Sequence, residues 1–232
     1  MLRSGAFILI DKPFDWTSFD VVNKLRIGIK IALGEKKYKL GHAGTLDPYA
    51  TGLLVLGGGS YTKKIEQVQN DEKYYQGTLE LGATTASYDA ELEIDQRFPY
   101  EHITREHLDE GVLSFKGHID QVPPLYSAIK INGQAAYKMA RKGVDITMKP
   151  RKVDIYDFDI TEFSSPMVKF DVRCGKGTYI RSLVHDLGKH VGSGAYLTQL
   201  RRTAIGQLSI DDAWTIENFV KRIDLEKQKL NQ

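Results

Sequence analysis

One short segment brings together the residue types that could carry chemistry: Gly41-His42-Ala43-Gly44-Thr45-Leu46-Asp47-Pro48. Its two glycines let the backbone approach a ligand closely, and they accompany an imidazole and a carboxylate, the groups of acid–base and nucleophilic chemistry. Taken alone, Asp47 before Pro48 is also typical of a helix start, with aspartate as the N-cap and proline as the first helical residue. The segment therefore indicates either a ligand-binding loop or a helix cap.

Other catalytic and metal-binding patterns are weak. No His-Glu-x-x-His motif occurs, and the histidine pairs 102/107 and 185/190 have a spacing that does not place both rings on one helical face. The single cysteine, Cys174, excludes an internal disulfide and fits a reducing cytoplasm. Neither a phosphate loop nor a Gly-x-Ser-x-Gly elbow is present. Zinc, nucleoside-triphosphate and serine or cysteine hydrolase chemistry are not favoured, and we expect no metal.

Charge is distributed unevenly along the chain. The 232 residues carry a formal net charge of +2, from 32 basic and 30 acidic side chains. Residues 1–64 hold 10 basic and 5 acidic side chains, residues 65–120 hold 4 and 13, and residues 172–203 hold 6 and 1. Two basic blocks separated by an acidic one are compatible with a nucleic-acid-binding face beside a solvated acidic surface.

Apolar patterning predicts the strands and helices that would position these groups. Thr17-Ser18 is typical of a helix N-cap, and Thr178 is expected to cap a helix that runs to about residue 190. The other main predicted elements are a helix over 104–113 and strands over 5–10, 74–81, 152–161 and 167–174. In the last strand, alternate residues from Val168 to Cys174 face inward. We expect a mixed α/β (α+β) fold with a largely antiparallel central sheet and flanking helices.

Composition and length bound the class of protein. Hydrophobic residues make up 41% of the chain and charged residues 27%, as in an ordinary globular protein. No apolar run approaches the length that spans a bilayer, and the apolar stretch near the N-terminus is too short for a signal peptide. We therefore expect a cytoplasmic protein that does not associate with a membrane.

Five motifs follow one another along the chain. They are Asp11-Lys12-Pro13 with Thr17-Ser18, the 41–48 segment, Lys73-Tyr74-Tyr75 leading to Leu81-Gly82, the stretch 121–128 with Lys130, and the stretch 175–181 with its continuation at 200–203. In this order they resemble the TruB family of tRNA pseudouridine synthases. The resemblance covers about residues 8–210 and implies a pseudouridine-synthase-like catalytic domain. It also implies an isomerase that moves the glycosidic bond of a uridine from N1 to C5.

The resemblance implies a role for each matching side chain. Asp47 is the implied nucleophile acting on a flipped-out uridine, and attack on the base and attack on the sugar both stay open. Tyr75 is implied to stack on the flipped uracil, and Leu200 to form an apolar wall beside the base. Tyr179 is implied to line the pocket and to assist removal of the C5 proton.

Arg181 and His42 complete the implied site. Arg181 falls in the first turn of a predicted helix, where a cation opposes the helix dipole, so a carboxylate partner is expected. Asp47 is the candidate partner, and such a pair would keep Asp47 ionised. His42 is implied to lie against the RNA loop and to help hold the base extruded.

The implied substrate is the uridine at position 55 of tRNA, presented by the T-arm stem-loop to a monomeric enzyme. No cofactor is expected, because the rearrangement is redox-neutral. Residues of about 124–151, with a turn signal at Asn132-Gly133, match the family's thumb insert, which is implied to close on the RNA loop. The candidate RNA-contacting side chains are Lys12, Lys63, Lys64, Lys130, Arg141, Lys176, Arg201 and Arg202.

The sequence departs from the family pattern at three places. Asp15 stands where the pattern usually has glycine, so this turn is expected to be built differently. Within the stretch 84–89, Ala86 and Ser87 replace the usual aspartate and threonine. The chain ends at Gln232, and we therefore expect a single catalytic domain over 1–232 without the C-terminal PUA-type domain of many relatives.

Two alternatives to a stand-alone tRNA enzyme remain. The first is a guide-RNA-dependent pseudouridine synthase, which shares the aspartate motif but docks its guide RNA with a PUA domain. The second is a non-catalytic tRNA-binding or folding module with a vestigial pocket. The intact set of Asp47, Tyr75, Tyr179 and Arg181 argues against the second.

Overall fold

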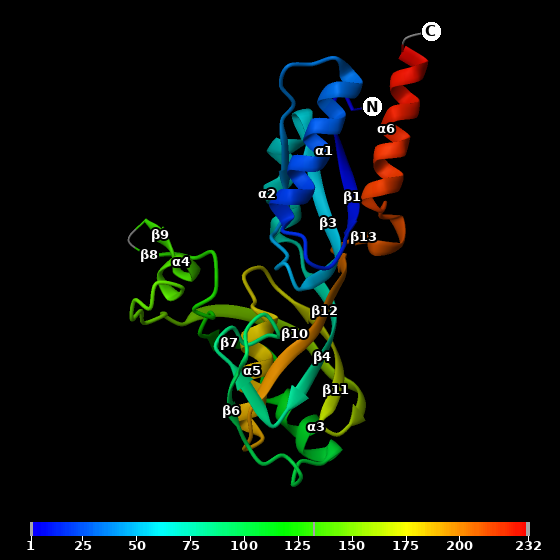
Figure 1. Cartoon of the computed structure of the whole chain (residues 1–232). Helices are drawn as coiled ribbons and strands as arrows, with labels where there is room; N and C mark the ends of the chain where they lie inside the picture. The colour runs from blue at the N-terminus through cyan, green and yellow to red at the C-terminus, as the bar shows by residue number, and fades with distance from the viewer. Residues whose placement is uncertain (1, 132, 231–232) are drawn as a thin grey trace. The chain divides into compact units, whose positions relative to one another are not determined.

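The computed structural model describes residues 2–131 and 133–230 of the chain. It contains two compact units, of which unit 1 comprises Met1–Tyr75 and Arg201–Gln232, and unit 2 comprises Gln76–Leu200. Two strands run from one unit into the other, β4 (Lys73–Leu81) and β12 (Ala195–Ile205). Figure 1 shows the course of the chain through these elements.

Unit 1 is a small antiparallel sheet with helices. Its strand order is β1-β3-β12, with β2 paired to β3 and β13 paired to β12. The register places Ala6 opposite Gly58 and Lys12 opposite Gly52. The remaining elements of unit 1 are β1 (Ala6–Lys12), α1 (Ser18–Leu33), β2 (Leu40–His42), β3 (Ala50–Gly58), the 3-10 helix η1 (Gly59–Lys64), α2 (Ile65–Asn70), β13 (Leu208–Ser209), the 3-10 helix η2 (Ile210–Asp212) and α6 (Ile216–Leu230).

Both faces of the β1–β3 pair are covered, which follows from the alternation of side chains along a strand. Leu54 and Leu56 pack with α1 and α6 in one apolar cluster, whereas Leu53 and Val55 pack with Val68 of α2 in another. Helices α1 and α6 contact each other and run alongside one another in Figure 1. A strand buried on both faces reads as a continuous apolar run, which is why β3 lacks a period of two in the sequence.

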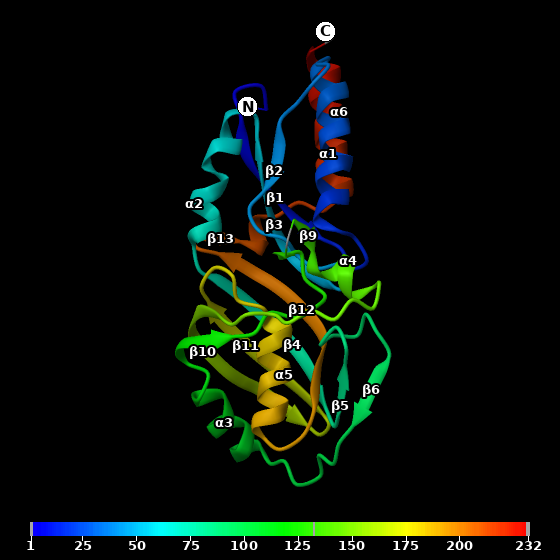
Figure 2. The same cartoon turned by 90° about the vertical axis from the view of Figure 1, so that its left-hand side faces the viewer.

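Unit 2 is built on five strands of the main sheet. Its strand order is β12-β4-β11-β10-β7, and β10 pairs antiparallel with both β11 and β7. Helix α5 lies against one face of these strands (Figure 2). The other elements of unit 2 are β5 (Ala83–Thr85), β6 (Ile94–Arg97), α3 (Arg105–Leu113), β7 (Gly117–Gln121), β8 (Lys130–Ile131), β9 (Gln134–Ala135), α4 (Ala136–Ala140), β10 (Arg151–Ser164), β11 (Met167–Cys174) and α5 (Ile180–His190).

The structure confirms the predicted mixed α/β fold with antiparallel pairing. Thr17 caps α1 in a capping box with Asp20, and the predicted inward face of β11 is buried from Val168 to Cys174. The predicted cap of α5 is wrong, because Tyr179 occupies the N-cap position and the Thr178 hydroxyl instead donates to the carbonyl of Gly175 at 3.0 Å.

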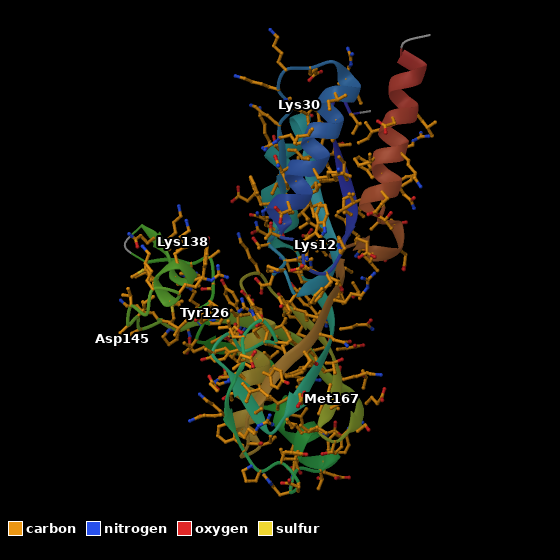
Figure 3. All side chains as sticks on the ribbon, in the orientation of Figure 1. Lys12, Lys30, Tyr126, Lys138, Asp145 and Met167 are labelled. Atoms are coloured by element: carbon orange, nitrogen blue, oxygen red, sulfur yellow. The ribbon has the colours of Figure 1, made fainter. Side chains whose placement is uncertain are left out.

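The segment of about 124–151 forms a small hairpin and a helix. β8 pairs antiparallel with β9, and α4 follows directly. The predicted Asn132-Gly133 turn includes Asn132, which lies outside the described residues. Figure 3 labels Lys138 and Asp145 on this segment.

The pH dependence of stability is expected to contain a contribution from His185. Burial, followed by the charge of Lys189, lowers the pKa of this ring from its ordinary 6.5 to about 4, against the opposing charge of Asp95. The unfolded chain therefore binds a proton between pH 6.5 and 4 that the folded chain does not, so the free energy of unfolding falls as pH falls through that window, by about 3 kcal/mol from this group. Chemical denaturation of wild type and His185→Phe at pH 7 and pH 4.5 measures it. The contribution is contradicted if both proteins lose the same stability.

Candidate active site

The 41–48 segment of unit 1 begins in β2, which ends at His42, and continues as the loop that leads to β3. No helix follows Pro48, so the interpretation of Asp47 as a helix cap is wrong. The amide of Ala43 donates to the carbonyl of Val55 at 2.8 Å, and the amide of Ala50 donates to the carbonyl of Asp47 at 3.1 Å. The loop is thus closed by backbone hydrogen bonds on either side of Asp47.

Both sequence neighbours of Asp47 are hydrogen-bonded to the 12–18 turn, which runs from the end of β1 to the first residue of α1. The hydroxyl of Ser18 accepts from the amide of Leu46 at 2.9 Å and donates to its carbonyl at 3.1 Å. The carbonyl of Pro48 accepts from the amide of Asp15 at 2.9 Å and from Nζ of Lys12 at 3.3 Å. Because a residue between two anchored neighbours has little backbone freedom, the direction of the Asp47 side chain is set by the 12–18 turn.

Lys12 is a buried cation that holds this turn. Its side chain is 0% exposed, and Nζ also donates to the carbonyls of Pro13 at 2.9 Å and Trp16 at 2.7 Å (labelled in Figure 3). Burial lowers the pKa of Lys12 to about 8, and the charge of Asp47 opposes that shift. The sequence predicts Lys12 as an RNA contact, but the structure places it inside unit 1 with its protons directed at backbone oxygens.

Arg202 is the second buried cation of unit 1. Its guanidinium donates to the carbonyl of Leu53 through Nε at 2.8 Å and to the carbonyl of Gly44 through Nη2 at 3.2 Å, and the residue is 1% exposed. Gly52 lies against its backbone, where a Cβ would stand 2.3 Å from the Arg202 carbonyl oxygen. The predicted RNA contact is corrected here too, since Arg202 ties the loop to β3 instead of reaching the surface.

Asp15 explains the first departure from the family pattern. Its φ is +63°, in the left-handed region where glycine is favoured and aspartate is one of the better-tolerated alternatives. The turn therefore keeps a left-handed conformation without glycine. The neighbouring Phe14 ring meets Tyr49 edge-on, with ring centroids 4.9 Å apart, so aromatic packing also joins the turn to the loop.

His42 and Tyr75 both belong to unit 1. His42 lies in β2, and burial lowers its pKa, although a backbone hydrogen bond with Gly44 opposes that effect. The imidazole is therefore neutral at pH 7. Tyr75 lies in β4 and is half-buried. These states fit a packed histidine beside the loop and an aromatic ring with part of its surface accessible.

The other predicted cations of unit 1 lie at its surface. Lys63 and Lys64 are exposed in η1, and Nζ of Lys64 stands 4.2 Å from the centroid of the Tyr61 ring. Arg201 forms a two-point ion pair with Asp11 at 3.0 and 2.7 Å. This pair borders a cavity of about 220 Å³, whose lining also includes polar side chains of Thr51, Thr215 and Glu217.

Arg181 lies in the first turn of α5 in unit 2 and is 4% exposed. Its Nη1 donates to the carbonyl of Ser87 at 2.9 Å, and its Nη2 donates to the carbonyl of Tyr126 at 2.9 Å. Its Nε lies 3.5 Å from a carboxylate oxygen of Asp89, which is also buried. The sequence analysis does not single out Asp89, whose only signal is its place at the end of the 84–89 stretch, and the expected pairing of Arg181 with Asp47 stays a prediction.

Tyr179 is held by a buried amide. The side chain of Gln121 accepts from the Tyr179 amide at 2.8 Å and donates to the Tyr179 carbonyl at 3.1 Å. Gln121 is 2% exposed. Gln121 resembles Ser18 in this respect. Gln121 bonds both the amide and the carbonyl of Tyr179, as Ser18 bonds both the amide and the carbonyl of Leu46. Both occur inside motifs that resemble those of the family, yet nothing in the sequence separates them from their neighbours.

The remaining predicted residues of unit 2 are more exposed. Lys130 and Lys176 are exposed, and Leu200 is half-buried in β12. Arg141 forms an exposed ion pair with Glu91 at 3.0 Å and lies 5.7 Å from the Tyr137 ring centroid. Unit 1 therefore carries Asp47, His42 and Tyr75, whereas unit 2 carries Tyr179, Arg181 and Leu200.

The described part of the chain shows neither a metal-binding cluster nor a membrane-spanning helix. Across 2–131 and 133–230, no group of three or more histidine, cysteine, aspartate or glutamate side chains is placed to hold a metal ion. None of the described helices is long and apolar enough to cross a membrane.

Two family models match the chain. The model described as TruB family pseudouridylate synthase (N terminal domain) matches residues 30–180. The model described as tRNA pseudouridylate synthase B C-terminal domain matches residues 181–232. Together they cover all but the first 29 residues.

Curated relatives match over nearly their whole length. The tRNA pseudouridine synthase B of Flavobacterium johnsoniae is 51% identical over 216 residues, which are 93% of this chain and 94% of that protein. The protein of the same name from Phocaeicola vulgatus is 47% identical over 225 residues, 97% of this chain and 96% of the relative.

A solved structure of similar fold is the crystal structure of a Cbf5–Nop10–Gar1 complex, with a TM-score of 0.74 and 27% identity. The match covers 98% of this chain but only 57% of the solved one. The chain thus spans just over half the length of that protein.

Two adjacent arginines allow a matched test of the buried hydrogen bonds. Arg202→Met is expected to lower the free energy of unfolding by about 2–4 kcal/mol, because it removes the buried guanidinium that donates to the carbonyls of Leu53 and Gly44. Arg201→Met removes a partly exposed ion pair and is expected to lower it by about 1 kcal/mol or less. Urea denaturation of both variants measures the difference. Equal losses of stability in the two variants would refute the assigned role of Arg202.

Proposed function

The chain belongs to the TruB family of pseudouridylate synthases, and we propose that Asp47 is the nucleophile with which it isomerises uridine to pseudouridine in tRNA. The observation that carries the assignment of Asp47 is its anchoring. Leu46 and Pro48 are both hydrogen-bonded to the 12–18 turn. A nucleophile gains most from such anchoring, since the attacking oxygen must be held in line with the reacting atom.

Two buried cations of unit 1 donate to backbone carbonyls of the loop that holds Asp47. Lys12 donates to Pro48 and Arg202 to Gly44, and the charge of Asp47 opposes the lowering of the Lys12 pKa by burial. Lys12 is therefore protonated at neutral pH despite its burial. We propose that the Asp47 carboxylate, which interacts electrostatically with Lys12, supplies the attacking oxygen.

The reaction balances without an added oxidant or reductant. The bond from C1′ of the ribose to N1 of the uracil breaks, and a bond from C1′ to C5 forms after the ring turns. The proton on C5 leaves, and N1 ends with a proton. Substrate and product have the same composition, so we propose that the enzyme needs neither a metal nor an organic cofactor.

The other site residues are assigned by their chemistry. We propose that Tyr75 stacks on the flipped uracil, Tyr179 assists removal of the C5 proton, and Leu200 bounds the pocket. His42, which is neutral at pH 7, would lie against the extruded loop without adding a charge. Because these residues are divided between the two units, we propose that residues 1–232 act as one catalytic domain.

Arg181 is proposed to act with Asp47 and Asp89. Its contacts within unit 2 include the carboxylate of Asp89 and the carbonyls of Ser87 and Tyr126. The expected ion pair of Arg181 with Asp47 joins residues of different units and stays a prediction.

The proposed target is the uridine at position 55 in the T-loop, bound by a monomer in the cytoplasm. The segment of about 124–151 is proposed as a thumb that closes on this loop. The exposed cations best suited to phosphate contacts are Lys63, Lys64, Lys130, Arg141, Lys176 and the partly exposed Arg201.

A guide-RNA-dependent synthase is the second candidate, and the likeness to the Cbf5 complex favours it. The near-complete mutual coverage with relatives named tRNA pseudouridine synthase B favours the stand-alone enzyme. The two candidates differ in one measurable respect, because a stand-alone enzyme modifies its substrate without any guide RNA.

Tritium release tests the stand-alone reaction. The purified chain, without guide RNA, is expected to release tritium from a T-arm hairpin labelled at C5 of the target uridine only. Asp47→Asn is expected to lower the rate by roughly 10³-fold or more, since it removes the nucleophile while preserving its shape. The matched control is Asp212→Asn, an exposed aspartate of unit 1, with a rate within about twofold of wild type. Release that is absent with wild type, or undiminished in Asp47→Asn, contradicts the proposal.

RNA binding is expected to weaken steeply with salt. Each phosphate contact releases counterions, so removal of one such contact changes the slope of log affinity against log salt by about 0.7–0.9. Lys63→Gln with Lys64→Gln is expected to reduce the slope by about 1–2, measured with the catalytically inactive Asp47→Asn protein and full-length tRNA. The control pair Lys152→Gln with Lys169→Gln alters the net charge equally but removes cations already paired with Asp120 and Glu162. Equal slope changes in both pairs would show a net-charge effect only.

A further inference from the structure

One face of helix α5 contacts the three consecutive residues 87–89. Arg181 and His185 are four residues apart, so their side chains lie one above the other on the helix. Arg181 binds the carbonyl of Ser87 and the carboxylate of Asp89. His185 meets the residue between them, because its ring stacks on that of Tyr88 with centroids 3.8 Å apart and planes 11° from parallel.

Tyr88 has a strained backbone at this position. Its φ is +64°, a left-handed conformation that is uncommon for a bulky side chain and persists only where the surroundings enforce it. Its amide donates to the carbonyl of Thr85 at 3.1 Å, and its carbonyl accepts from the amide of Leu197 at 3.0 Å. The conformation turns the ring toward α5 while the flanking Ser87 carbonyl and Asp89 carboxylate stay directed at Arg181.

His185 is suited to this contact because it is neutral. It is 7% exposed, and Arg181 and Lys189 stand one turn before and one turn after it on α5. A protonated His185 would add a third positive charge to this face of α5, between Arg181 and Lys189, and both would repel it. Burial holds the pKa of His185 at about 4, even though Asp95 opposes that shift, so a neutral aromatic ring separates the two cations at neutral pH.

We propose that Tyr88 and His185 are positioning residues for the isomerisation, and that their ring stack holds Ser87 and Asp89 in the geometry that orients the Arg181 guanidinium. The inference rests on the proposed function, since it takes Arg181 to act in catalysis. Neither ring is assigned a contact with the RNA. Removal of the stack should therefore reduce turnover while leaving the binding of RNA nearly unchanged.

Substitutions at Tyr88 separate the ring from the backbone. Tyr88→Gly keeps the left-handed conformation accessible but removes the stack, and we expect kcat for tRNA to fall about tenfold or more with KM within about threefold, since small displacements of a catalytic group carry losses of this size. Tyr88→Phe keeps the ring and is expected to retain kcat within about twofold of wild type. Single-turnover rates with saturating enzyme confirm that the affected step follows binding.

Substitutions at His185 test the partner ring. His185→Ala is expected to reproduce the loss in kcat, and His185→Phe to restore most of it because a neutral aromatic ring remains. If the two rings act as one unit, the double variant Tyr88→Gly with His185→Ala loses no more than either single variant.

A destabilised control separates positioning from a general loss of stability. Val184→Ala truncates a fully buried side chain of the same helix that makes none of the contacts described for residues 87–89. All rates are measured well below the midpoint of thermal unfolding of each variant, where Val184→Ala should keep its kcat. Equal kcat losses in Val184→Ala, or unchanged kcat in Tyr88→Gly and His185→Ala, would overturn the inference. Failure of the proposed function gives a different result, because wild type then releases no tritium at all.

Discussion

The role proposed for Asp47 depends on the anchoring of two residues, Leu46 and Pro48, in the loop between β2 and β3. Leu46 is bound through both its backbone groups by one hydroxyl, and the Pro48 carbonyl accepts two donors from the turn before α1. Asp47 lies between these two anchored residues. A carboxylate on a freely moving loop would lose much of its reactivity to misorientation, so the fold of unit 1 serves this geometry directly. The 12–18 segment is held at its two ends, where Lys12 and Ser18 are buried, and Trp16 packs against the apolar cluster of α1, β1 and β3.

Buried cations give both units their local order, although the sequence suggests surface roles for two of them. Lys12 and Arg202 in unit 1 and Arg181 in unit 2 are each at most 4% exposed, and each donates to backbone carbonyls. A buried cation requires such acceptors, because an unpaired charge in the interior is strongly unfavourable. Each of these long side chains donates to carbonyls of two or more segments and so holds those segments close together. The proposed phosphate contacts are therefore assigned to other, more exposed cations.

Backbone strain is found beside the proposed site residues in both units. Asp15 and Tyr88 are the non-glycine residues with positive φ in the described chain, at +63° and +64°. Each adjoins a residue that the proposed mechanism uses, since the Asp15 amide binds Pro48 and Tyr88 lies between two ligands of Arg181. Such conformations persist where surrounding contacts over-determine them, and they cluster at functional sites for that reason. The two positions thus reflect tight packing around the reacting groups.

Sequence patterns were sufficient for the mixed fold, for the strands and helices with strong apolar periodicity, and for the segment around Asp47. They failed where the deciding contact was remote. Asp47-Pro48 has the pattern of a helix cap but is followed by β3, and Thr178 has the pattern of the α5 cap although its hydroxyl binds Gly175.

Residue types alone also could not show that Lys12 and Arg202 face inward, or that Asp89, Gln121 and Ser18 hold neighbouring residues of the proposed site. Local sequence patterns indicate propensity and the identity of reactive groups. Burial and hydrogen-bond partners come from segments far apart in the chain, as in the bond from Arg202 to Leu53, which are 149 residues apart. Only folding brings such segments together.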